Sequence, residues 1–224
     1  MPSAGEPSHA ERAGFRLIYV ADPMCAWCWG FAPALAEVRG ALGADVGFEL
    51  VLGGLAPDDE QPMPEELRRY IQSAWDAVEA RTGVRFNRDF WTACAPRRST
   101  WPACRAVLAA ERLAAGAGWP VFQALQRAYY LEARNPSERE TLAAVFTETV
   151  RGGPGAEAFL ETLDGPEVRA ELDAHFRRRD ALEAHAFPTL LVQHGEQVAS
   201  LARGYASAAE LRGQLTALGL TPAS

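Results

Sequence analysis

The first part of the chain alternates short apolar runs with one amphipathic segment. Residues 15–22, FRLIYVAD, are rich in β-branched and aromatic side chains and precede a proline, which is typical of a buried strand that closes in a loop. A second apolar run, VGFELVLGG (46–54), predicts another strand. Between them, apolar residues fall on one face of a helix that Gly43 ends, namely Phe31, Leu35, Val38 and Leu42. This order predicts a right-handed βαβ unit with parallel strands.

A long region of helical periodicity follows this unit. It begins after PDDEQPMP (57–64) and extends to about His185. Ser137 and Glu140 have the spacing of a capping box, which predicts a helix start at that point. The apolar spacing in the first two thirds of the region predicts helices at about 67–82, 101–115, 119–133 and 138–150.

The C-terminal part returns to strands. PTLLVQ and QVASL are short apolar runs joined by HGE, and a final helix is predicted from Ala206 to about Leu218. The whole order predicts an α/β fold, a thioredoxin-like fold with an inserted all-helical domain. We expect residues 15–56 and 166–220 to form the thioredoxin-like domain and residues 57–165 to form the insertion.

Composition narrows the classes of function. The chain is 48% hydrophobic and 23% charged, as in globular proteins, and its net charge of -7 with no long basic block argues against nucleic acid as a partner. All 22 basic residues are arginine, which excludes Schiff-base chemistry on lysine. No apolar run approaches the ~20 residues of a membrane span. The polar start, MPSAGEPSHAERAG, lacks the pattern of a secretory signal, so we expect a cytoplasmic protein.

Four cysteines are too few for a disulfide scaffold, but two of them form a Cys-x-x-Cys motif. Cys25 and Cys28 lie where the first strand gives way to the first helix. Free N–H groups at a helix N-terminus stabilise an anion, which favours the nucleophilic thiolate at Cys25. Cys28, one turn further on, is within reach to form a disulfide. We therefore expect Cys25 to be the exposed attacking thiol and Cys28 the shielded one that resolves a mixed disulfide.

Three other interpretations of the pair are open. A structural zinc site needs four ligands, but Cys94 and Cys104 have nine residues between them and the chain has only four histidines. A static disulfide across two residues would stabilise the fold little, because the benefit grows with loop length. Two core cysteines would need no helix N-terminus. We favour redox chemistry, and we expect Cys94 and Cys104 to be secondary, either as a structural disulfide or as two partly buried thiols.

Several segments together resemble one family. They are DPMCAWCWGFAP (22–33), GGLAPD (53–58), RFNRDFW (85–91), RSTWPACRAV (98–107) and FPTLLV (187–192). The chain resembles the DsbA-like thioredoxin-fold family, in particular its FrnE-like predicted protein-disulfide isomerase subgroup, over most of residues 16–215. The Cys-x-x-Cys motif with the distant proline is the most specific element of this resemblance.

The resemblance implies roles for particular residues. Cys25 corresponds to the nucleophile, Cys28 to the resolving cysteine and Pro188 to a cis-proline that faces them. Phe187 would present its backbone to a substrate, and Trp27 is the other expected substrate-binding residue. No metal and no cofactor beyond the redox-active pair are implied. The expected partners are protein or peptide thiols and disulfides, with glutathione as a further candidate.

We therefore predict a thiol-disulfide oxidoreductase or protein-disulfide isomerase. The dipeptide Ala26-Trp27 lacks the histidine of strongly oxidising DsbA proteins, which leaves the redox direction open. One alternative is an enzyme like the kappa-class glutathione transferases or 2-hydroxychromene-2-carboxylate isomerases, which share the fold but carry serine at the position of Cys25. Another is a non-catalytic binding or chaperone module with an apolar contact patch formed by Trp27, Trp29 and Phe31.

Overall fold

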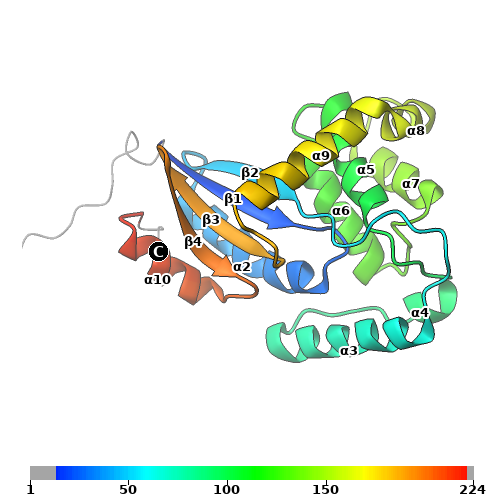
Figure 1. Cartoon of the computed structure of the whole chain (residues 1–224), viewed down its shortest axis with the longest axis horizontal. Coiled ribbons are helices and arrows are strands. Elements are labelled where there is room, and N and C mark those ends of the chain that lie inside the picture. Colours follow the sequence, from blue (N-terminus) through cyan, green and yellow to red (C-terminus); the bar gives the residue numbers. More distant parts are fainter. Residues whose placement is uncertain (1–13, 221–224) are drawn as a thin grey trace, which may run out of the picture.

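A four-stranded sheet lies at the centre of one half of the molecule (Figure 1). The structure is a computed structural model and describes residues 14–220. The expectation of a cytoplasmic protein is based on the polar stretch at residues 1–14. Except for Gly14, this stretch lies outside the described residues. The strand order is β2-β1-β3-β4, with bounds Phe15–Ala21 (β1), Gly47–Leu52 (β2), Thr189–His194 (β3) and Gln197–Arg203 (β4).

The pairing of the strands confirms the predicted βαβ unit. β1 and β2 are parallel and are joined by helix α2 (Ala26–Leu42), whereas β3 pairs antiparallel with both β1 and β4. Alternate residues of β1 face opposite sides of the sheet, since side chains alternate along a strand. Leu17 and Tyr19 belong to the main core with α2, while Ile18 and Val20 belong to a small second cluster.

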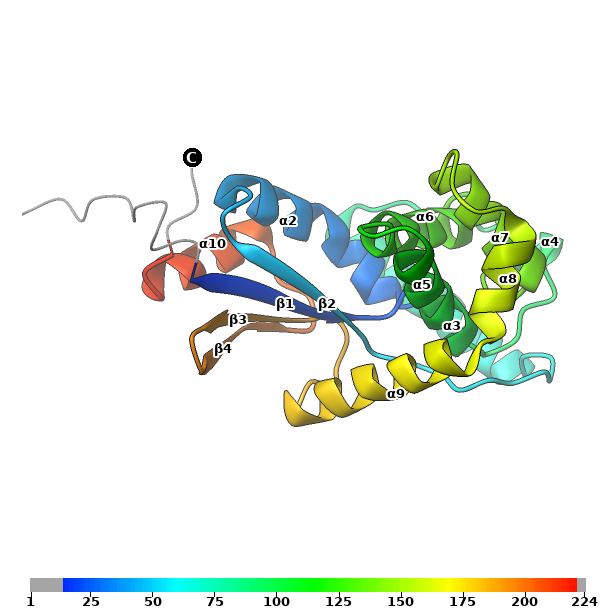
Figure 2. The same ribbon diagram turned by 90° about the horizontal axis from the view of Figure 1, so that it is seen from above.

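Helices cover the sheet and extend from one end of it (Figure 2). α2 and α10 (Ala208–Ala217) lie on one side, and α9 (Pro166–Ala181) runs past β2 on the other. The remaining helices lie between β2 and α9 in the sequence, as predicted: α3 (Glu65–Thr82), α4 (Phe90–Ala93), α5 (Trp101–Leu113), α6 (Gly118–Tyr130), α7 (Arg139–Thr149) and α8 (Ala156–Asp164). This is the α/β, thioredoxin-like arrangement with inserted helices that the element order predicts.

The capping box predicted at Ser137 and Glu140 is wrong. Helix α7 begins one residue later, its N-cap is Glu138, and no side chain caps it. The Ser137 hydroxyl instead donates a hydrogen bond to the Ser99 carbonyl at 2.7 Å, so a contact across 38 residues replaces the local one. A complete capping box is present at the start of α10, between Ser207 and Glu210.

A single aromatic residue organises the packing of α3 against the other helices. Trp75 is fully buried, whereas Tyr70 on the same helix is 70% exposed. Trp75 contacts rings from α4, α6 and the segment before α4, namely Phe86, Phe90, Trp91, Tyr129 and Tyr130. Buried aromatic clusters of this kind contribute strongly to stability because each ring buries a large apolar area.

Trp75→Ala should therefore lower the free energy of unfolding by about 3–5 kcal/mol, since it removes a buried ring and leaves a cavity. Urea unfolding followed by far-UV circular dichroism measures this change. The matched control is Tyr70→Ala, an exposed aromatic on the same helix, which should stay within about 0.5 kcal/mol of the wild type. Equal losses for the two variants would contradict the role given to Trp75.

Candidate active site

The Cys-x-x-Cys motif lies at the start of α2. Cys25 is the N-cap residue with extended backbone, and its carbonyl accepts the first hydrogen bond of the helix from the Trp29 N–H at 3.1 Å. Cys28 lies one turn further on and has no exposed surface. Cys25 is 6% exposed, so it is more exposed than Cys28, as expected, although it too is nearly covered.

The loop before β3 lies directly against Cys25. The Phe187-Pro188 peptide bond is cis, as the resemblance implies. The Cys25 thiol donates a hydrogen bond to the Phe187 carbonyl at 3.6 Å, a contact between residues 162 positions apart. The Pro188 carbonyl accepts a hydrogen bond from the Gly204 N–H at 2.7 Å. The structure therefore brings Cys25, Cys28, Phe187 and Pro188 to one place.

The Phe187 ring fixes this loop from the other side. It packs on Gly53 so closely that a Cβ at position 53 would collide with the ring. Gly53, in the GGLAPD segment after β2, has no side chain and therefore lets the Phe187 ring lie directly against the backbone. Among the described residues, none accepts a hydrogen bond from the Phe187 N–H.

Trp27 and Phe187 line a hollow beside the dithiol. Its volume is about 380 Å³, and Arg81, Gly204 and Tyr205 complete its lining. Both residues predicted to bind substrate therefore border one open space.

The apolar patch that the sequence suggests does not form as a unit. Phe31 is fully buried in the main core. Trp29 stacks on Tyr130 at 5.7 Å between ring centroids and donates its indole N–H to the Arg85 carbonyl. Of the three residues, only Trp27 lines the hollow.

Sequence reasoning missed the buried carboxylate beside the motif. Asp22 has no exposed surface and ties together three segments of the chain. It accepts hydrogen bonds from the Met24 N–H at 2.8 Å, the Leu55 N–H at 2.7 Å and the Thr100 hydroxyl at 2.7 Å. The DPMC motif contains the residue, but its partners lie up to 82 positions away, the farthest being the Cys104 thiol.

Burial sets the electrostatics of this centre. It raises the pKa of Asp22 although three hydrogen bonds act in the opposite direction. Burial also raises the pKa of the Cys28 thiol well above its usual value, and the adjacent Cys25 sulfur adds to the effect. A Cys28 thiol that keeps its proton suits a residue that reacts second.

The other two cysteines are separate thiols. Cys94 is half-buried and donates a hydrogen bond to the Ala133 carbonyl at 3.1 Å. Cys104 is fully buried and lies 3.6 Å from a carboxylate oxygen of Asp22. Of the two arrangements expected for this pair, the structure has the free thiols. Within residues 14–220, no group of three or more His, Cys, Asp or Glu side chains is arranged to hold a metal ion.

No described helix combines the length and apolar character needed to cross a membrane. Searches with protein-family models and against curated proteins find no match for this sequence. Solved structures do match it.

The similar structures have the same fold, and they are described as disulfide isomerase, disulfide reductase or oxidoreductase. A candidate protein disulfide isomerase from Nitrosomonas europaea is 28% identical, with a TM-score of 0.78 over 91% of this chain and 96% of that one. The cytosolic disulfide reductase DsbM from Pseudomonas aeruginosa is 30% identical, with a TM-score of 0.70 over 84% of this chain and 89% of that one. The oxidoreductase DsbA from Xylella fastidiosa shares the fold at 17% identity, with a TM-score of 0.59 over 95% of this chain and 87% of that one.

The fold, together with two cysteine thiols at a helix N-terminus, defines this chain as a thioredoxin-fold redox protein. The chain belongs to the DsbA-like family. It is a thiol-disulfide oxidoreductase.

Titration of Asp22 should be visible in the stability of the protein. Because its pKa in the folded state is raised above the usual 3.8, the carboxyl stabilises the fold fully only below that pH. This contribution is lost as pH rises through the folded-state pKa. The free energy of unfolding of the wild type minus that of Asp22→Asn should therefore fall from about pH 4 to about pH 7. Urea unfolding of both proteins across this range measures the difference, and a difference that grows with pH would contradict the assignment.

Proposed function

We propose that Cys25 and Cys28 together reduce or rearrange disulfides of protein or peptide substrates. The Cys25 thiolate attacks one sulfur of the substrate disulfide, forms a mixed disulfide and releases the other sulfur as a thiolate. Cys28 then loses its proton and attacks the Cys25 sulfur, which frees the second substrate thiol. Two electrons pass to the substrate, and the protein is left with a Cys25–Cys28 disulfide. No further cofactor is needed for these steps.

The contact between Cys25 and the Phe187 carbonyl carries this proposal. It supports a site in which the attacking sulfur lies beside an extended backbone segment. An approaching substrate chain could accept a hydrogen bond from the Phe187 N–H, which no described residue uses. Trp27 would cover an apolar substrate side chain in the adjoining hollow. Pro188 would shape the backbone on the other side of the sulfur.

We infer that reduction or isomerisation is the physiological direction, with glutathione or a similar small thiol as the electron donor. The likeness to a disulfide reductase that has also been solved with glutathione, at 31% identity, supports this direction. The reductase is described as cytosolic, which supports a cytoplasmic site of action here as well. The dipeptide Ala26-Trp27, without histidine, agrees with a pair that is not strongly oxidising.

Cys28 distinguishes this proposal from the related transferases and isomerases that share the fold. A glutathione transferase needs no resolving thiol, whereas the proposed cycle cannot be completed without one. In this chain Cys28 has no exposed surface, and its thiol interacts with that of Cys25.

In the reduced protein, iodoacetamide should label Cys25 well before Cys28. Cys25 retains some exposure, while Cys28 is fully buried and its thiol has a raised pKa. The experiment uses a Cys94→Ala, Cys104→Ala background so that only the motif reacts, and peptide mapping by mass spectrometry identifies the labelled residue. Preferential labelling of Cys28 would reverse the two roles.

The Cys94→Ala, Cys104→Ala double variant also serves as the control for turnover. It should reduce insulin at most of the wild-type rate, Cys25→Ser should reduce it only at the uncatalysed rate, and Cys28→Ser should accumulate mixed disulfides visible on non-reducing gels. Loss of turnover in the folded control would show that electrons pass through Cys94 or Cys104. Unchanged turnover in Cys25→Ser would contradict the whole proposal.

A further inference from the structure

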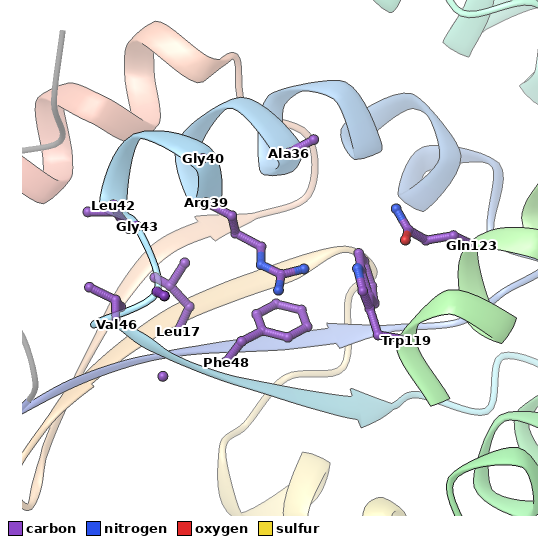
Figure 3. Close-up of a pocket in the computed structure, with 12 residues that line it drawn as sticks. Leu17, Ala36, Arg39, Gly40, Leu42, Gly43, Val46, Phe48, Trp119 and Gln123 are labelled. Atoms are coloured by element: carbon purple, nitrogen blue, oxygen red, sulfur yellow. The ribbon is translucent and has the colours of Figure 1, made fainter. Parts of the chain in front are cut away.

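A second cavity lies away from the dithiol, between the C-terminal half of α2, the start of β2 and the start of α6. Its volume is about 580 Å³, which is in the range of ~300–1,000 Å³ found for small-molecule sites. Its lining includes Arg39, Phe48, Trp119 and Gln123, and most of the other lining residues are small or aliphatic. Figure 3 shows the Arg39 side chain reaching across the cavity toward Phe48 and Trp119.

Arg39 is held by aromatic rings instead of by a carboxylate. The central carbon of its guanidinium lies 3.7 Å from the centroid of the Phe48 ring and 5.0 Å from that of Trp119. Trp119 and Phe48 support each other edge to face, at 5.0 Å between centroids. Cation–π contacts of this kind fix the plane of the guanidinium but leave its N–H groups free to donate.

No ion pair or side-chain hydrogen bond of Arg39 occurs within residues 14–220. Glu37, on the same helix, pairs with Arg212, and Glu111 on α5 accepts hydrogen bonds from the Gly116 and Gly118 N–H groups. Arg39 is half-buried, and this burial lowers the pKa of its guanidinium. None of the Arg39 nitrogen atoms is buried without a hydrogen-bond partner, so its N–H groups are open to an acceptor that enters the cavity.

We propose that this cavity binds a small organic anion, with its carboxylate or phosphate on Arg39 and an aromatic or other flat apolar body against Trp119 and Phe48. A planar guanidinium donates two parallel hydrogen bonds to either anionic group, and this geometry is specific to oxyanions. The Gln123 amide, at the rim of the cavity, adds a donor and an acceptor for polar groups of the ligand.

The proposed site is separated from the dithiol along α2. Arg39 follows Cys25 by 14 residues of α2, which corresponds to about 20 Å along the helix axis at ~1.5 Å per residue. None of the residues that line the cavity touches Cys25, Cys28 or the Phe187-Pro188 loop through a hydrogen bond. Variants of this cavity should therefore leave insulin reduction unchanged.

Isothermal titration calorimetry with phenyl phosphate, benzoate and neutral benzyl alcohol tests the proposal. At least one of the two anions should bind saturably with one-to-one stoichiometry, and the tighter one identifies the preferred anionic group. Arg39→Gln should weaken that binding at least about tenfold, the usual effect of losing a charged hydrogen-bond partner. The matched control is Arg69→Gln, which removes an exposed arginine of α3 and should change nothing.

Two further measurements test the proposal without requiring that Arg39→Gln folds correctly. Gly40→Leu keeps Arg39 but places a side chain over the cavity, where a Cβ meets no atom within 4 Å, and it should also weaken binding. In the wild type, the bound anion should protect Arg39 from phenylglyoxal, as mapped by mass spectrometry. Absence of saturable binding by both anions, equal binding of benzyl alcohol, or equal labelling of Arg39 with and without the anion would overturn the proposal.

Discussion

The buried carboxylate of Asp22 fixes the position of the dithiol relative to the rest of the molecule. It accepts hydrogen bonds from the loop that leads into α2, from the turn after β2 and from Thr100 at the start of α5. Three loops that would otherwise bury unpaired N–H or O–H groups are thereby satisfied by one side chain. Because Thr100 belongs to the inserted helices, the insertion is held directly against the redox motif.

The same junction shapes the surroundings of the Cys25 thiol. The turn after β2 places Gly53 under the Phe187 ring, and this packing brings the Phe187 carbonyl to the Cys25 thiol. Cys28 is covered completely, and the hollow lined by Trp27 and Phe187 is open beside the dithiol. Burial that protects Cys28 also raises the pKa of its thiol, which agrees with the proposed order of the two chemical steps.

Local patterns in the sequence were sufficient to predict the secondary-structure elements and the role of the Cys-x-x-Cys motif as a dithiol. The apolar spacing predicted the strands and most helices within a few residues, and the position of Cys25 and Cys28 at a strand-to-helix junction predicted the dithiol. Features that depend on distant contacts could not be found in this way. Asp22 looks like an ordinary loop residue until Leu55 and Thr100 are placed beside it. The Ser137 hydroxyl does not cap α7 as predicted, because it donates its hydrogen bond to the Ser99 carbonyl.

The reduction potential of the Cys25–Cys28 pair, measured by equilibration with glutathione and its disulfide, tests the central claim most directly. A pair that reduces or rearranges disulfides should have a potential at or below about -180 mV, in the range of protein disulfide isomerase, glutaredoxins and thioredoxin. A potential near the ~-120 mV of the strong oxidant DsbA would contradict the account, because such a pair would take electrons from its substrates.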